Sequence, residues 1–186
     1  MAKKSKRSAK KPAKKKAKVN PIPAGMRTIT PHLVIKGASQ ALEFYKKAFG
    51  AKELEKSPLP DGKLMHASIK IGDSVVMMAD EFPGSSMKAP DSAGSTTVAI
   101  HVYSKNVDKL WQQALDAGAK VSMPLDNQFW GERYGQLQDP FGHLWSMSQR
   151  VKMSPTEMKE KEQQAMAMFS QGEHPSKTET PQISAP

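Results

Sequence analysis

One series of predicted elements occurs twice along this chain of 186 residues. Alternating and helical apolar patterns predict a strand, a helix and three more strands in residues 26–80, and residues 96–150 repeat that order. A shift of 68 residues places Leu42 on Leu110 and Gly50 on Gly118. Few matched residues are identical, so the repeat rests on the order of the elements. The pattern therefore predicts two copies of one small α+β module.

Each module is predicted from its local patterns. We expect strands at residues 28–36, 51–56, 63–71 and 74–80 in the first module, and at 96–103, 120–124, 134–138 and 143–150 in the second. Helices are expected at 38–49 and 105–117, each followed by a glycine that can end it. Residues 81–95 are rich in Pro, Gly and Ser and are predicted to be a linker.

The first 25 residues differ from the rest in composition. They carry ten Lys or Arg and no acid, whereas residues 26–150 carry fourteen basic and thirteen acidic residues. We predict a disordered arm, because it has too few large apolar side chains for a core. Such an arm can attract nucleic acid without sequence specificity through counterion release, and a solubilising tail without a partner is the alternative. The candidate contacts are Lys10, Lys11, Lys14, Lys15 and Lys16.

The C-terminal segment, residues 151–186, is predicted to hold one more helix at 154–170, followed by a disordered tail. Ser154 is a good N-cap, Pro155 suits the first helical position and Glu157 completes a capping box. We expect this helix to lie on the domain or on a second subunit.

Several classes of protein are excluded or disfavoured by what the sequence lacks. Without Cys there is no disulfide, thiolate zinc site or cysteine nucleophile. No apolar run approaches the roughly 20 residues that cross a membrane, and the N-terminus has no apolar stretch of a secretory signal. We therefore expect a cytoplasmic protein without a membrane partner, with association with the nucleoid through the arm as a further hypothesis.

Candidate functional residues fall into two groups. His32 and His66 are imidazoles on predicted strands, but a metal site needs three or four converging ligands. The shift of 68 residues leaves His32 and His101 one residue out of register, which predicts that they point to opposite sides. Near the second hairpin, Trp130 can stack on a flat ligand, while Arg133 and Tyr134 can bind an anionic or phenolic one. The competing interpretation is a loop pinned by an Arg–acid pair, with Trp130 as its plug.

Three segments resemble the vicinal oxygen chelate superfamily, which includes glyoxalases, bleomycin-resistance proteins and extradiol dioxygenases. They are ALEFYKKAFGA at 41–51, QFWGERYG at 128–135 and DPFGHLW at 139–145. The likeness covers about residues 28–150 and is strongest to the PhnB-like branch. It implies paired βαβββ modules (26–80 and 96–150) that form a curved mixed sheet around a cleft, and a homodimer.

Metal-using members of this family hold a divalent ion with inward residues on the first and last strands of each module. The resemblance aligns those positions with Thr30, Val76, Val98 and Ser146. These residues are not the His, Gln and Glu side chains that such a site uses. The resemblance therefore predicts that this chain departs from the metal chemistry of the family.

The sequence favours a metal-independent domain without a cofactor that binds a small organic molecule in its cleft. The expected binding residues are His32, His66, Trp130, Arg133 and Tyr134. One alternative is a divalent-metal lyase or isomerase of the glyoxalase type, using Ni²⁺, Zn²⁺ or Mn²⁺ on a shifted set such as His32 and His66. Another is a scaffold that acts on nucleic acid through the basic arm. The sequence leaves open whether the protein is an enzyme.

Overall fold

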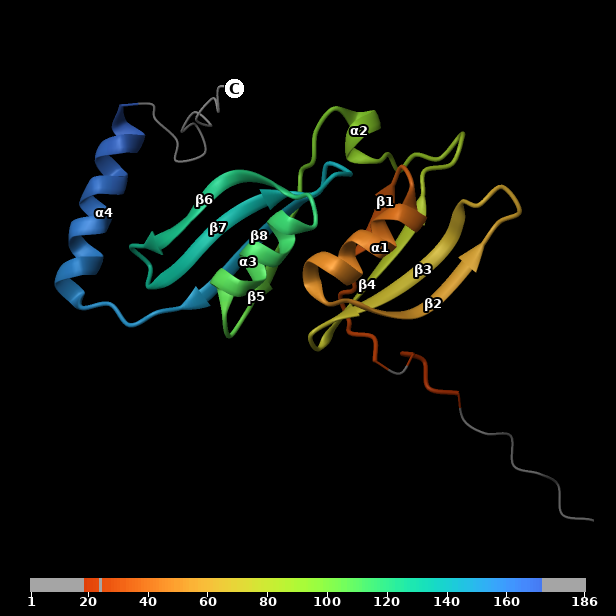
Figure 1. Ribbon diagram of the computed structural model, residues 1–186, viewed down its shortest axis with the longest axis horizontal. Coiled ribbons are helices and arrows are strands. Elements are labelled where there is room, and N and C mark those ends of the chain that lie inside the picture. The colour runs from red at the N-terminus through yellow and green to blue at the C-terminus, as the bar shows by residue number, and fades with distance from the viewer. Residues whose placement is uncertain (1–18, 24, 172–186) are drawn as a thin grey trace, which may run out of the picture.

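Two βαβββ modules follow one another in the computed structural model, which describes residues 19–23 and 25–171 (Figure 1). The first contains β1 (His32–Ile35), α1 (Ala38–Phe49), β2 (Lys52–Pro58), β3 (Leu64–Ile71) and β4 (Ser74–Asp80). The second contains β5 (Ala99–Tyr103), α3 (Val107–Asp116), β6 (Lys120–Gln128), β7 (Glu132–Gln138) and β8 (Leu144–Arg150). The short α2 (Pro90–Ala93) lies in the linker, and α4 (Pro155–Ser170) follows the second module. The predicted α+β class and the repeated order are confirmed.

The strands form two separate four-stranded sheets, not one continuous sheet. Their orders are β1-β4-β3-β2 and β5-β8-β7-β6, with β1 parallel to β4 and β5 parallel to β8. The modules meet through their helices, because α1 packs on α3 at the junction (Figure 1). Each module therefore keeps one sheet face against its helix and one face directed away from it.

Three element boundaries differ from the sequence-based expectation. The strand β1 begins at His32 because Pro31 has no N–H to donate, although the Pro31 carbonyl accepts a 2.9 Å bond from the N–H of Met77. The strand β6 runs on to Gln128 and pairs with β7 from Glu132, so the segment expected as a long loop is a hairpin. The linker holds the short helix α2, which begins at Pro90.

The hydrophobic core is shared between the modules. Tyr45 and Phe49 on α1 contact Trp145 on β8, with ring centroids 5.3 and 4.4 Å from that of the indole. Trp145 is fully buried. Because the modules bury aromatic rings in one cluster, we expect them to unfold as one unit.

Two buried carboxylates hold the backbone at the ends of elements. Asp139 accepts bonds from the hydroxyl of Tyr45 (2.7 Å) and the indole N–H of Trp145 (2.9 Å), and also from the N–H groups of Phe141 and His143. Burial, together with the nearby Asp139 charge, raises the pKa of the Tyr45 hydroxyl well above its usual value. The carboxylate of Asp80 accepts bonds from the first N–H groups of α1 and from Leu64.

The helix α4 is stabilised mainly by its own sequence. The predicted capping box is present, with Ser154 and Glu157 bonding to each other's backbone N–H. None of its residues is buried, and its ion pair with β6 is a long one, at 3.9 Å between Lys161 Nζ and Asp126 Oδ2. The helix therefore lies on the domain surface without being part of the core.

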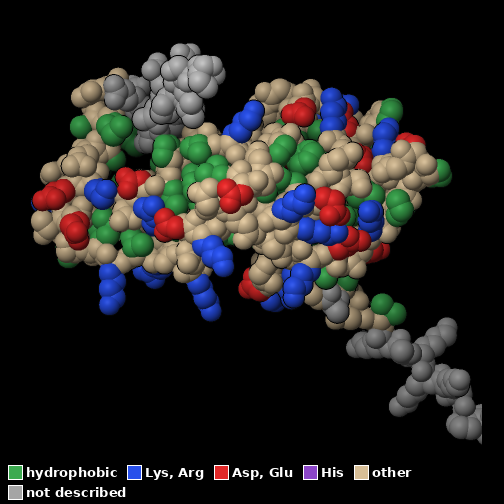
Figure 2. All heavy atoms as spheres, in the orientation of Figure 1, with side chains coloured by type: hydrophobic (Ala, Val, Ile, Leu, Met, Phe, Trp, Pro, Cys, Tyr) green, Lys and Arg blue, Asp and Glu red, His purple; other side chains and the backbone are tan. Residues whose placement is uncertain are grey.

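Acidic and basic side chains are interspersed over the face of the molecule shown in Figure 2, without a large region of one sign. This agrees with the balanced composition of residues 26–150. No helix among the described residues has the length and apolar character needed to span a bilayer.

Candidate functional site

The face of the second sheet directed away from α3 is lined by polar side chains. Trp145 and Met147 of β8 belong to the core, so the alternating residues Ser146 and Ser148 point to the other face. On the neighbouring strand β7, Tyr134 pairs with Ser148, and Gln136 pairs with Ser146. The alternation along two strands thus puts hydroxyl and amide groups together on one face.

Hydrogen bonds connect these groups. The side-chain N–H of Gln136 donates to the Tyr134 hydroxyl at 2.8 Å and to Ser146 Oγ at 3.2 Å, and that hydroxyl lies 3.0 Å from Ser146 Oγ. His101 Nε2 lies 2.8 Å from Ser148 Oγ. These bonds hold the ring of Tyr134 and the imidazole in defined orientations, as a binding surface requires.

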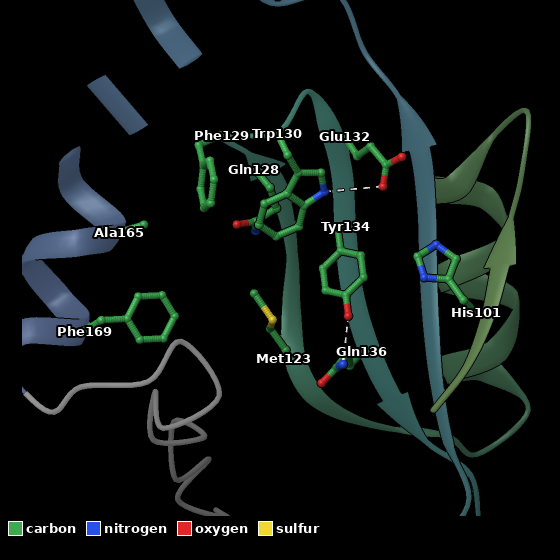
Figure 3. Close-up of a pocket in the computed structure, with 10 residues that line it drawn as sticks. All are labelled: His101, Met123, Gln128, Phe129, Trp130, Glu132, Tyr134, Gln136, Ala165 and Phe169. Atoms are coloured by element: carbon green, nitrogen blue, oxygen red, sulfur yellow. Dashed lines mark hydrogen bonds between the residues drawn. The ribbon is translucent and has the colours of Figure 1, made fainter. Parts of the chain in front are cut away.

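Aromatic rings stand above this polar floor at the β6–β7 hairpin. The ring centroids of Trp130 and Tyr134 are 5.5 Å apart with planes at 72°, and Phe129 meets Trp130 at 4.9 Å and 85°. The indole N–H of Trp130 donates a 3.3 Å bond to the carboxylate of Glu132 (Figure 3). Rings at near right angles present two faces to the same space.

A cavity of about 420 Å³ occupies the space between this face and α4. In Figure 3, Phe169 and Ala165 of α4 approach it from the side opposite the sheet, so that the C-terminal helix forms one wall. The lining consists of His101, Met123, Gln128, Phe129, Trp130, Glu132, Tyr134, Gln136, Ala165 and Phe169.

The structure brings only two of the five expected binding residues, Trp130 and Tyr134, into this cavity. His32 and His66 lie on the first sheet, with ring centroids 6.3 Å apart, and are not part of the lining. Partial burial is the main cause that lowers the pKa of His32, and the neighbouring His66 lowers it further.

Arg133 lies on the opposite face of β7 from the cavity. Its guanidinium bonds to Asp108 of α3, at 2.9 Å from Nε and 2.7 Å from Nη2. This is the Arg–acid pair of the competing interpretation, although Trp130 lines the cavity and is not a buried plug. The arm lysines Lys10, Lys11, Lys14, Lys15 and Lys16 lie outside the described residues.

The register corrects the expected relation between the two modules. His32 is paired with Met77 across β1 and β4, and His101 is paired with Ser146 across β5 and β8. His32 and His101 are therefore equivalent, and both point away from their helices, whereas opposite sides were expected. The shift that relates these strands is 69 residues, one more than the shift that relates the helices.

The family's metal positions fall elsewhere once this register is known. Val76 belongs to the core, and Thr30 and Val98 precede their strands, while His32, Met77, His101 and Ser146 face away from the helices. This set has no carboxylate, its Met offers only a soft thioether, and Ser146 and His101 already bond to their neighbours. No three His, Asp or Glu side chains converge anywhere in the described part of the chain. These residues do not fit the divalent ion.

Sequence reasoning missed His101, Gln136 and Phe169 as cavity residues. The spacing of Tyr134 and Gln136 by two residues is a signal that was available, since it puts both on one face of a strand. No local signal indicates that Phe169 approaches the hairpin, because that depends on how α4 folds back.

Comparison with known proteins identifies the fold family. A model of the Glyoxalase/Bleomycin resistance protein/Dioxygenase superfamily matches residues 28–147. The chain belongs to this superfamily. The helix α4 lies beyond the matched residues, so the superfamily's shared segment contains the hairpin but not the wall formed by α4.

Three similar proteins illustrate this membership. The uncharacterized protein Rv0887c of Mycobacterium tuberculosis is 47% identical over 148 residues, which cover 78% of this chain and 84% of that protein. The crystal structure of TioX from Micromonospora sp. ML1 is similar with a TM-score of 0.53 and 25% identity, covering 69% of this chain and all of TioX. The PhnB protein of Bacillus cereus has a TM-score of 0.54 at 19% identity, covering 66% and 99%, which supports the fold.

Proposed function

We propose that this superfamily member binds a flat organic molecule in the cavity between the second sheet and α4, without a metal ion. The observation that carries the proposal is the cavity itself. Its volume of about 420 Å³ lies within the range of roughly 300–1,000 Å³ that is usual for small-molecule sites.

The lining suits a ligand with an aromatic body and a few polar groups. Trp130, Tyr134 and Phe169 offer ring faces for stacking. Gln136 and Glu132 offer hydrogen-bonding groups at defined places on the same wall, as orientation of a ligand requires. The ring of Tyr134 is held from below by its bonds to Gln136 and Ser146, so little side-chain freedom is lost on binding.

Independence from metal is supported by the side chains at the family's metal positions. A set made of His32, Met77, His101 and Ser146 lacks the carboxylate oxygen that helps to neutralise a divalent ion. The alternative of a metal-dependent lyase would need a further ligand beside His32 and His66.

Binding is tested by calorimetric titration of the full chain with 9-anthracenemethanol, a flat neutral compound. We expect saturable binding that is unchanged by EDTA and weakened at least about tenfold by Trp130→Ala, since an aromatic stacking contact contributes about 1–3 kcal/mol. The matched control is Trp111→Phe, on α3 outside the cavity. Stoichiometric binding of Ni²⁺, Zn²⁺ or Mn²⁺ that is lost in His32→Ala would contradict metal independence.

We also propose a homodimer, as the resemblance implies. Exposed apolar side chains on the edge strands support it, with Leu54 of β2 exposed by 53% and Tyr103 of β5 by 67%. Light scattering of the purified chain gives the mass directly, and a monomer at micromolar concentration would refute the dimer.

The nucleic-acid hypothesis for residues 1–25 remains a proposal that rests on composition, as do cytoplasmic localisation and association with the nucleoid. If the arm is the contact, deletion of residues 1–25 abolishes retention on DNA-cellulose at low salt and leaves the unfolding curve unchanged. Retention of the shortened chain would rule the arm out as the contact.

A further inference from the structure

We infer that the ligand of this cavity is an organic cation, an inference that rests on the proposed function and specifies its ligand class. The structural basis is the carboxylate of Glu132. It is half-buried in the cavity wall, and it is the only side chain with a formal charge at neutral pH in the described lining if His101 is neutral.

The carboxylate of Glu132 has little compensation within the chain. Its one hydrogen bond is the 3.3 Å contact from Trp130 Nε1, and no Lys or Arg of the described residues forms an ion pair with it. A carboxylate that is partly removed from water without a cation is unfavourable, so a bound positive charge stabilises it.

The two arginines closest in sequence and register do not neutralise Glu132. Arg133 is the next residue, but it points to the other face of β7 and bonds to Asp108. Arg150 is opposite Glu132 in the β7–β8 register, yet it is exposed, forms no ion pair and does not line the cavity. Lys161 is paired with Asp126. The position of a cation in the wall is thus left to the ligand.

The aromatic rings around this carboxylate favour the same charge. Trp130 and Tyr134 meet at 72°, and Figure 3 shows the carboxylate of Glu132 beside the edge of the indole while the ring faces are directed into the cavity. A cation over such faces is attracted by their electron density, and two or more rings around one cation form an aromatic cage. An anion would meet both the ring faces and the carboxylate unfavourably.

The test compares three flat tricyclic compounds by calorimetry on the full chain: the cation 10-methylacridinium, the neutral 9-anthracenemethanol and the anion 9-anthracenecarboxylate. We expect the cation to bind about tenfold more tightly than the neutral compound, and the anion to bind most weakly. In Glu132→Gln, whose amide oxygen can still accept from Trp130, the ratio of cation to neutral affinity falls to about one.

Glu55→Gln is the matched control, because it removes the same charge from an exposed position on β2 of the first module. It should leave all three affinities unchanged. Equal binding of cation and neutral compound by the natural chain overturns the cation inference alone, as does a preference that survives Glu132→Gln. Failure of all three compounds to bind contradicts the proposed cavity function and this inference with it.

Discussion

The hydroxyl of Tyr45 donates a 2.7 Å hydrogen bond to the carboxylate of Asp139, which lies 94 residues later in the chain. The bond joins helix α1 of the first module to the β7–β8 turn of the second. Both groups are buried, and the same carboxylate also holds the indole of Trp145. The contact therefore fixes how the two modules sit on each other.

Replacing Tyr45 by Phe tests this contact. The ring packing is retained and the hydroxyl is lost, so we expect the free energy of unfolding to fall by about 1–3 kcal/mol, the usual cost of removing a bond to a charged group. Urea unfolding measures the change. Tyr103→Phe is the control, because the side chain of Tyr103 is 67% exposed and makes no hydrogen bond among the described residues. Equal stability of the two variants would contradict a structural role for the bond.

Gly135 is needed where β7 passes α3. A Cβ at this position would lie 2.7 Å from Trp111 Cζ3 and 2.8 Å from the backbone Cα of Leu125. Its φ is not positive, so the requirement is space, not backbone conformation. We expect Gly135→Ala to destabilise the fold by about 1–3 kcal/mol, as overpacking of a core does.

A second change tests the cause of that loss. If Trp111 is the obstacle, Trp111→Leu in the Gly135→Ala background should cost less than Trp111→Leu in the natural chain, as a double-mutant cycle of unfolding free energies would show. Additive losses would point instead to the Leu125 backbone as the sole obstacle.

His143 makes stability depend on pH. It is buried in the β7–β8 turn, its Nε2 has no hydrogen-bond partner, and burial lowers its pKa from the ordinary 6.5. Asp139, Asp91 and the backbone of Val34 counteract this shift only in part. The stabilisation is complete above pH 6.5 and is lost as the pH falls through the lowered pKa, because the unfolded chain then binds the proton more readily.

We therefore expect the melting temperature to fall between pH 7 and pH 5, and to fall less in His143→Gln. His32 has a pKa lowered in the same direction, so His32→Gln is the companion variant that separates its contribution. A pH profile in His143→Gln identical to that of the natural chain would assign the effect elsewhere.

The wall formed by α4 predicts an effect on ligand binding without an effect on folding. Phe169→Ala removes a ring that lines the cavity, and we expect the affinity for 10-methylacridinium to fall about tenfold or less, as loss of one aromatic contact does. Met166→Ala on the same helix is the control, since Met166 does not line the cavity and is 63% exposed. No residue of α4 is buried, so both variants should unfold like the natural chain.

Tyr134→Phe tests the polar floor of the cavity. The change removes the hydroxyl that accepts from Gln136 and leaves the ring, so the orientation of Gln136 is less restricted. We expect weaker ligand binding by a fewfold with little change in stability, because the hydroxyl lies in a half-buried network and not in the core. Calorimetry with the same probe measures it, and an unchanged affinity would show that the network does not support the site.

Local patterns predicted much of the fold, and the reason is physical. Apolar spacing decides between helix and strand over a few residues, so α1, β3, β4 and α4 were predicted within two residues of their observed ends. The hairpin at β6–β7 was missed, because its turn is a Trp-Gly pair flanked by polar strands without apolar alternation.

By itself, the sequence determined the repeat, the two helices that join the modules and the family, since these depend on short-range periodicity and on motifs such as DPFGHLW. Only the tertiary structure decided which side chains share a surface. Irregularities in the β2–β3 and β6–β7 ladders change which residues pair, and a strand reverses its faces with each residue of shift. For that reason Arg133 was expected beside Tyr134 but pairs with Asp108 on the other face, while His101 and Phe169 line the cavity.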